Sequence, residues 1–323
     1  LRLARLAAHL LPDDPETALY LAGRLVQHSR RLADADEVLA RFPESVRLGP
    51  VWIAWQITWM MGSGQYAGAL SLWESHPELH TLPDPATFYS VAACLTQTGQ
   101  FEQAADLARR GLALNEVTSA QRASLHNVSS IVRALMGQPE AAEAHLEAAL
   151  ALAREHGLHQ MLGALLQNRT KNLERTDRFA AALTAARGAF QAYAEAGDTV
   201  RQANAGVLVA GHLTEFGQYQ EAETLLLDSL ALLERQGTSR FLVVAQTTLA
   251  TLYRDWQPPH GAVLALRVAR GALEQARQLG PVSSLTTFAL ATLARAEAAV
   301  GELEQATLHA QEAVDASGLA PDE

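Results

Sequence analysis

The most regular hydrophobic pattern in the chain lies between residues 217 and 232, behind a glycine. Tyr219 follows Gly217 by two residues, Ala222 comes three residues later, and Ser229 lies another seven residues on. Glycine readily ends a helix in the left-handed conformation, and residues seven apart lie on one face of the next helix. Small side chains on that face let a partner helix approach closely. The pattern therefore predicts two helices joined by a tight turn.

Similar segments recur along the chain. In the best copy, residues 99–114, Gly99, Phe101 and Ala104 have the same spacing. The positions that correspond to Tyr219 are Leu32, Tyr66, Phe101, Pro139, Phe179, Tyr219, Ala262 and Leu303. Consecutive positions are 34, 35, 38, 40, 40, 43 and 41 residues apart, so each helix gains most of a turn along the chain. Eight stacked helix pairs, and therefore an α-solenoid, are predicted.

The chain is expected to have three parts. Residues 1–15 form a helix and linker that remain from a longer protein, residues 16–317 form one superhelix, and residues 318–323 form a tail. The segment Leu1 to Leu11 is apolar around most of its circumference. A helix of this kind needs cover on more than one side, so we expect an upstream segment or a second copy of the chain to pack against it.

Two later segments depart from the pattern. In the seventh pair, Pro258 and Pro259 forbid helix and predict a longer loop. The last helix, residues 303–317, is predicted to be a terminal cap with one apolar stripe and a soluble outer face. The stripe consists of Leu303, Ala306, Ala310, Ala313 and Val314, and the outer face consists of Glu304, His309, Gln311, Glu312 and Asp315.

These repeats resemble the tetratricopeptide repeat (TPR) family over residues 16–317. The small–aromatic–Ala–small frame is clearest in the third, fifth and sixth pairs, at Phe101, Phe179 and Tyr219. The resemblance implies an all-α fold, a right-handed α-solenoid of about eight TPR-like helix pairs. The step near 40 residues is similar to that of the TPR sensor domains of MalT-like and SARP-type bacterial transcription regulators. It implies signal sensing and protein binding in transcription regulation.

Composition limits the partners and the compartment. The formal net charge of −10 argues against nucleic-acid binding by this chain, because phosphate binding needs clustered Lys and Arg. Cys94 is the only cysteine, which excludes an internal disulfide and suits a reducing compartment. No apolar run approaches the roughly 18 residues that span a bilayer. We therefore expect a cytoplasmic protein that contacts neither nucleic acid nor membrane directly.

The sequence argues against a nucleotide-binding site. No phosphate-binding loop is present, and the only lysine, Lys171, is far from any glycine. Residues 62–67, from Gly62 to Ala67, match the dinucleotide fingerprint in form, but that fingerprint follows a strand. Here a helical pattern of tryptophans precedes it, so the glycines indicate a turn between helices.

The residues that could carry catalysis or bind metal have ordinary structural explanations. His156 and His159 lack a third ligand nearby in sequence, and His76 and His80 flank a proline in a loop, so surface or cap roles are favoured. Cys94 falls on the apolar side of a helix and is expected to be a buried thiol. The acidic residues Glu102, Glu140 and Glu221 stand at helix starts, where they suit the dipole. No enzyme, metal or cofactor is predicted.

The TPR resemblance places a binding surface on the first helix of each pair, which lines a concave groove in that family. The corresponding residues are Tyr89, Asn127, Gln160, Gln167, Asn168, Lys171, Arg175, Asn204 and Arg254. A protein or peptide partner, or a small-molecule inducer, is the expected occupant; the competing explanation is that these polar residues are simply solvated. A strict carboxylate clamp is disfavoured, because Ile131 and Gly211 occupy its companion basic positions.

A second candidate surface is aromatic. Trp52, Trp55 and Trp59, at positions i, i+3 and i+7, form one stripe, and Tyr66 completes the aromatic cluster. Such a stripe is most often core, here between the first and second pairs. The alternative is a hydrophobic dock for a partner helix or a planar ligand.

Together these patterns favour a non-catalytic scaffold that binds a protein or ligand, the sensor or interaction domain of a bacterial transcription regulator. A stand-alone TPR adaptor that mediates protein assembly is the first alternative. The second is the targeting arm of an enzyme whose catalytic part lies outside this chain.

Overall fold

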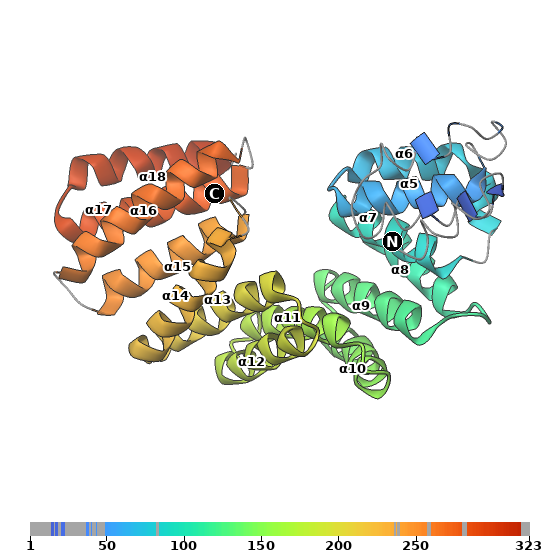
Figure 1. Ribbon diagram of the computed structural model, residues 1–323, viewed down its shortest axis with the longest axis horizontal. Helices are drawn as coiled ribbons and strands as arrows, with labels where there is room; N and C mark the ends of the chain where they lie inside the picture. Colours follow the sequence, from blue (N-terminus) through green and yellow to red (C-terminus); the bar gives the residue numbers. More distant parts are fainter. Residues whose placement is uncertain are drawn as a thin grey trace. The chain divides into compact units, whose positions relative to one another are not determined.

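The structure, a computed structural model, describes residues 49–81, 84–235, 237, 240–256, 260–279 and 283–317, together with scattered positions between 14 and 43. Every regular element in these residues is a helix, as predicted, and they contain no strand (Figure 1). Contacts between residues divide the chain into two compact units, Leu1–Gly157 and Leu158–Glu323. Each unit is described by itself, and one superhelix over residues 16–317 stays a prediction.

Unit 1 holds three helix pairs in its described residues. They are α5 (Pro50–Gly62) with α6 (Tyr66–Ser75), α7 (Pro85–Gln97) with α8 (Phe101–Leu112), and α9 (Ser119–Leu135) with α10 (Pro139–Glu155); the short 3-10 helix η1 (Pro77–Thr81) follows α6. The first helices contact one another in order, α5 with α7 and α7 with α9. Their shared core contains the fully buried side chains of Ile57, Val91 and Leu125.

The described residues of unit 2 form four pairs of the same kind. They are α11 (His159–Glu174) with α12 (Phe179–Glu195), α13 (Thr199–Glu215) with α14 (Tyr219–Arg235), α15 (Arg240–Trp256) with α16 (His260–Gln278), and α17 (Ser283–Val300) with α18 (Leu303–Ser317). Here α13 contacts α15, and α15 contacts α17. The fully buried side chains of Leu213, Leu226 and Leu252 mark one part of the core.

The turns within the pairs form as the glycine pattern predicts. Gly217 has φ 73°, its N–H donates to the Thr214 carbonyl at 3.0 Å, and Tyr219 then begins α14. In the fifth pair Asp177 occupies the corresponding left-handed position, with φ 56°. Aspartate tolerates this conformation better than most residues, so the turn survives without glycine. Residues with a left-handed backbone recur every 20 positions, at 137, 157, 177, 197, 217 and 237. Each of them follows the end of a helix, so the helices α9 to α14 end in the same way.

Small residues hold the helices together as expected. Ala222 and Ser229 on α14 are both buried. A Cβ placed on Gly206 of α13 would lie 2.6 Å from the Ser229 hydroxyl oxygen, too close for any ordinary contact. The two helices therefore approach each other at a point where only glycine fits.

The lengthening of the repeat is also confirmed. Helices α7 and α8 have 13 and 12 residues, whereas α9 and α10 have 17 each. In the seventh pair α15 ends at Trp256 and α16 begins at His260, and the loop predicted at Pro258 and Pro259 lies outside the described residues.

The predicted stripe of the last helix is only partly correct. Ala306 and Ala313 of α18 are buried, but Leu303 is 66% exposed, and Ala310 and Val314 are exposed as well. His309, assigned to the soluble face, is instead half-buried against a neighbouring helix. The predicted stripe was too wide because, among the described helices, α18 packs mainly against α17 and leaves the rest of its apolar residues uncovered.

Several predictions fall outside the described residues. They concern the covered helix Leu1 to Leu11, the first pair with Leu32, and the tail from residue 318. Within the described residues, no helix combines the length and apolarity that crossing a membrane requires.

Candidate functional site

Two of the predicted groove residues on α11 are used to hold unit 2 together. The Gln160 side-chain amide donates to Asp198, the N-cap of α13, at 2.8 Å. Seven residues later, Gln167 accepts a hydrogen bond of 2.9 Å from the Tyr193 hydroxyl of α12. Burial raises the pKa of Tyr193 to about 12, so its hydroxyl stays a donor. Both glutamines therefore join helices within unit 2, and a role for either in ligand binding stays a prediction.

A third polar contact on the same face of α11 lies at the C-terminal end of this helix. Glu174, seven residues beyond Gln167, lies 2.9 Å from Nε2 of His212 on α13, which is 5% exposed. The Nδ1 atom of His212 lies 3.3 Å from Glu215. Side chains thus bridge α11 and the parallel helix α13 near both ends, so the two helices form one surface with a fixed register.

Lys171 and Arg175 remain available on that surface. Both are exposed, one turn apart, and Arg175 caps the C-terminus of α11. The Lys171 side chain forms no hydrogen bond or ion pair with any residue that the structure describes. Asn168 is half-buried and already has a partner, and Asn204 is half-buried on α13. Of the predicted residues in unit 2, the two cations are the ones most open to a partner.

The remaining predicted groove residues lie on other first helices. Tyr89 of α7 and Asn127 of α9 belong to unit 1, where both are half-buried. Burial raises the pKa of Tyr89, and nearby Cys94 adds to the rise. Arg254 of α15 is held by its neighbour Asp255 through two contacts of 2.6 and 3.0 Å.

The tryptophan stripe lies on α5 as predicted. Trp52 is buried, whereas Trp55 and Trp59 are half-buried. The packing of α5 against α6 and α7 relies on Ile53 and Ile57 instead. The stripe therefore faces away from the main core of unit 1, and its contacts with the predicted first pair lie outside the described residues.

The residues considered for catalysis or metal binding have the structural roles expected. His159 begins α11 and lies 2.8 Å from Glu195, and His80 bonds the Trp73 carbonyl at 3.0 Å. Cys94 is buried, and burial raises its pKa to about 11, which makes it a poor nucleophile. Among the described residues, no three His, Cys, Asp or Glu side chains are grouped so that they could hold a metal ion.

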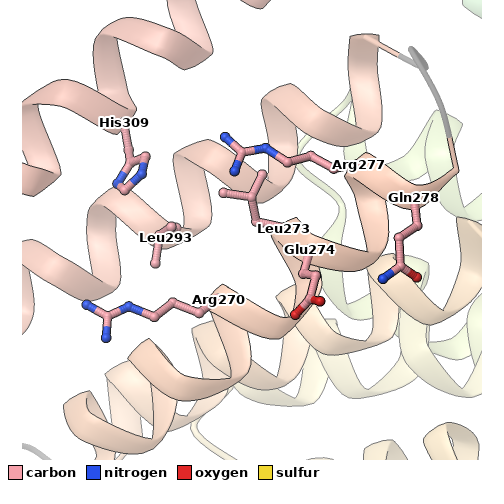
Figure 2. Close-up of a pocket in the computed structure, with 7 residues that line it drawn as sticks. All are labelled: Arg270, Leu273, Glu274, Arg277, Gln278, Leu293 and His309. Carbon is pink, nitrogen blue, oxygen red and sulfur yellow. The ribbon is translucent and has the colours of Figure 1, made fainter.

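The structure adds a site that the sequence did not indicate, an open groove of about 560 Å³ between α16 and α18 with α17 beneath it (Figure 2). It is lined by Arg270, Leu273, Glu274, Arg277, Gln278, Leu293 and His309. Figure 2 shows the heads of Arg270, Arg277 and His309 around Leu293, whereas Glu274 and Gln278 point away from them. We call it the α16–α18 groove.

Two exposed ion pairs border the α16–α18 groove. Arg270 contacts Glu302, the residue before α18, at 2.9 Å. Seven residues further along α16, Arg277 contacts Glu312 at 2.9 Å. All four side chains are about half exposed, so solvent screens these pairs, and each contributes little to stability.

A buried carboxylate lies behind the groove. Glu297 of α17 is 1% exposed, and Nδ1 of His309 contacts its carboxylate at 2.8 Å. The signal in the sequence was a lone acid on an apolar stripe, since Glu297 follows Leu290 and Leu293 at helical spacing. That signal was missed because the partner histidine lies on another helix.

Comparison with known proteins supports the fold alone. No family model matches the chain, and no curated protein matches it. Among solved structures, the STAND protein with a tetratricopeptide repeat sensor from Pyrococcus horikoshii superposes with a TM-score of 0.71 at 12% identity. The fold is of the TPR type. The match covers 96% of this chain but only 50% of that protein, which is a signal transduction ATPase with numerous domains.

Two further TPR-like structures superpose over most of this chain. Aspartyl phosphate phosphatase F from Bacillus subtilis gives a TM-score of 0.64 at 14% identity and covers 90% of this chain and 75% of its own. A Rap protein in complex with competence and sporulation factor gives 0.61 at 13% identity, covering 94% and 98%. At such identities the TPR-type solenoid is shared, while ligand, activity and residues are not established by the likeness.

Proposed function

We propose that this chain is a non-catalytic binding scaffold, the sensor or interaction domain of a bacterial transcription regulator. The observation that carries the proposal is the α11–α13 surface, which side chains fix in register while Lys171 and Arg175 stay open to a partner. The likeness to a protein with a TPR sensor supports the sensing role. The single, buried Cys94 fits a cytoplasmic location.

The physical argument concerns preorganisation. A partner that binds a surface already held in place loses less free energy to ordering than one that must first assemble it. The Gln160–Asp198 and Glu174–His212 contacts hold this surface near both ends of α11. Two exposed cations one turn apart suit an acceptor-rich group, such as the carboxylate of a protein or peptide partner or of a small inducer.

A second candidate is a stand-alone adaptor that assembles other proteins. The observation that favours it is the superposition over 98% of a Rap protein, which resembles this chain over nearly its own full length. A sensor and an adaptor would bind different partners through the same surface, so the binding assay below tests that surface for both candidates.

The test is a binding screen with synthetic peptides, each made with a free and with an amidated C-terminus. Fluorescence anisotropy and thermal shift are measured on the wild type, Lys171→Ala, Asn204→Ala and the control Arg295→Ala, which removes an exposed arginine of α17. We expect peptides with a free carboxylate to bind, and Lys171→Ala to weaken them about tenfold. Equal binding to the wild type, Lys171→Ala and Asn204→Ala would show that the proposed surface is wrong.

A further inference from the structure

The α16–α18 groove lies on second helices, apart from the first-helix surface proposed above. Its floor is formed by Leu273 and Leu293, which are buried, and its sides carry Arg270, Arg277 and His309. Small-molecule sites are typically concave, with volumes of about 300 to 1,000 Å³ and a few polar groups that fix the ligand. At about 560 Å³, the groove falls in this range.

We propose that the α16–α18 groove binds a small organic anion, a compact molecule with a carboxylate or phosphate head. This goes beyond the proposed partner surface, because it uses different helices and different residues. The head would lie among Arg270, Arg277 and His309, and the body would cover Leu293.

The arginines have donors to spare. Each guanidinium carries five N–H groups, and Arg270 and Arg277 each contact their glutamate through one terminal nitrogen, Nη2. The other N–H groups can donate to a second acceptor. Carboxylates and phosphates are the groups that a guanidinium binds best, because their oxygens match its planar fork.

Glu297 positions His309 for the same task. With Nδ1 held by the Glu297 carboxylate, the ring orientation is fixed, and Nε2 has no hydrogen-bond partner among the described residues. A carboxylate that is 1% exposed is costly to keep, and an apolar residue would pack there without that cost. The Glu297–His309 pair is therefore better explained by a role at the groove than by the stability of α17.

Two glutamates compete with an entering anion for the arginines of the groove. Glu302 and Glu312 occupy the arginines from outside, so an entering anion has to displace at least one of these carboxylates. Because both pairs are exposed and weak, displacement costs little. It follows that removing the charge of Glu302 or Glu312 should strengthen anion binding, an effect opposite to that of removing an arginine.

The experiment is a calorimetric titration with sodium phosphate, succinate and benzoate at constant ionic strength, with potassium chloride as the reference. The variants are Arg270→Ala, Arg277→Ala, Glu302→Gln and Glu297→Gln. The matched control is Arg187→Ala, which breaks an exposed ion pair of 2.8 Å with Glu221 between α12 and α14. Circular dichroism spectra establish that each variant is folded.

We expect saturable binding of at least one probe, weakened about tenfold by Arg270→Ala or Arg277→Ala and strengthened about threefold by Glu302→Gln. Glu297→Gln should change the pH profile of binding, which loss of packing alone would not do. Preference for phosphate over benzoate, or the reverse, identifies the head group.

Two results overturn the proposal. One is the absence of saturable binding by all three probes, and the other is an equal effect of Arg187→Ala. Neither result affects the proposal for the α11–α13 surface. Lys171 lies outside the α16–α18 groove, so Lys171→Ala is expected to leave these titrations unchanged. The two proposals can therefore fail separately.

Discussion

The two ends of unit 2 are closed by different kinds of contact. Around α11 the contacts are buried, with Tyr193 of α12 packed against α11 and the buried ring of His212 on α13 in contact with Glu174. Between α16 and α18 the seam consists largely of two exposed ion pairs, and Leu303 of α18 stays exposed. A buried seam fixes geometry, whereas an exposed and charged seam can exchange its partners. This difference assigns a preformed surface to one end and an exchangeable site to the other.

The largest effect is expected where the buried seam is tightest. A Cβ on Gly163 would lie 2.7 Å from the Tyr193 ring, so Gly163→Ala should lower the free energy of unfolding by about 3 kcal/mol through overpacking. Urea denaturation measures this. The control at the open end is Gly271→Ala on α16, where nothing lies within 4 Å of the new Cβ, and we expect a gain of about 0.5 to 1 kcal/mol.

A double variant sharpens the first prediction. Tyr193→Leu makes room beside Gly163, so Gly163→Ala should cost less in that background than in the wild type. If both glycine substitutions had the same effect on stability, the contrast between a tight and an open end would be wrong.

The second prediction removes the polar contact that joins α11 to α13. His212→Ala loses the hydrogen bonds to Glu174 and Glu215, and we expect about 2 kcal/mol of destabilisation in a urea titration, since the carboxylates retain partial access to water. His159→Ala is the control, because its contact with Glu195 is about half exposed, and it should change stability by less than about 0.5 kcal/mol. A cost for His159→Ala as large as that for His212→Ala would contradict the comparison.

The turns and small residues were readable from the sequence because their physics is local. A glycine two residues before Tyr219, and alanine three after it, specify a left-handed turn and a close helix contact without knowledge of any distant residue. This is why the starts of α6, α8, α10, α12, α14 and α18 were predicted at the residues where they occur.

The site could not be read in the same way, because its contacts join distant residues. Gln160 finds its partner 38 residues later, and Arg270 finds Glu302 32 residues later. Helical spacing places a side chain on a face, but it does not say what lies opposite. The contacts of Gln160 and Gln167 with neighbouring helices were therefore not predicted, and His309 was assigned to solvent.

The third prediction concerns a seam of intermediate burial, between α9 and α10 in unit 1. Nδ1 of His126 lies 3.0 Å from Nδ1 of His145, a contact in which one ring donates and the other accepts. Burial lowers the pKa of His126, and His145 and Arg122 lower it further. Burial, followed by Arg133, lowers the pKa of His145. The folded chain therefore binds fewer protons here than the unfolded chain does.

Stability from this pair should be complete above the ordinary histidine pKa of about 6.5 and should be lost as pH falls below it. Because the rings are only half-buried, the loss by pH 5.5 should not exceed about 1 kcal/mol. Urea midpoints at pH 7.5 and 5.5 measure it. The variant that carries both His126→Gln and His145→Gln should lose less stability over this range, and an unchanged pH slope would contradict the assignment.

The smallest effect is expected at the open end itself. A double-mutant cycle with Arg270→Ala and Glu302→Ala should give a coupling of about 0.5 kcal/mol, because both side chains are about half exposed. The coupling should nearly vanish in 1 M salt, where the Debye length is about 3 Å. The Arg187–Glu221 pair, equally exposed and 2.8 Å apart, should behave alike. A coupling above about 2 kcal/mol for Arg270 alone would mean that its glutamate is a fixed part of the fold, and the α16–α18 groove could then not exchange it for a ligand.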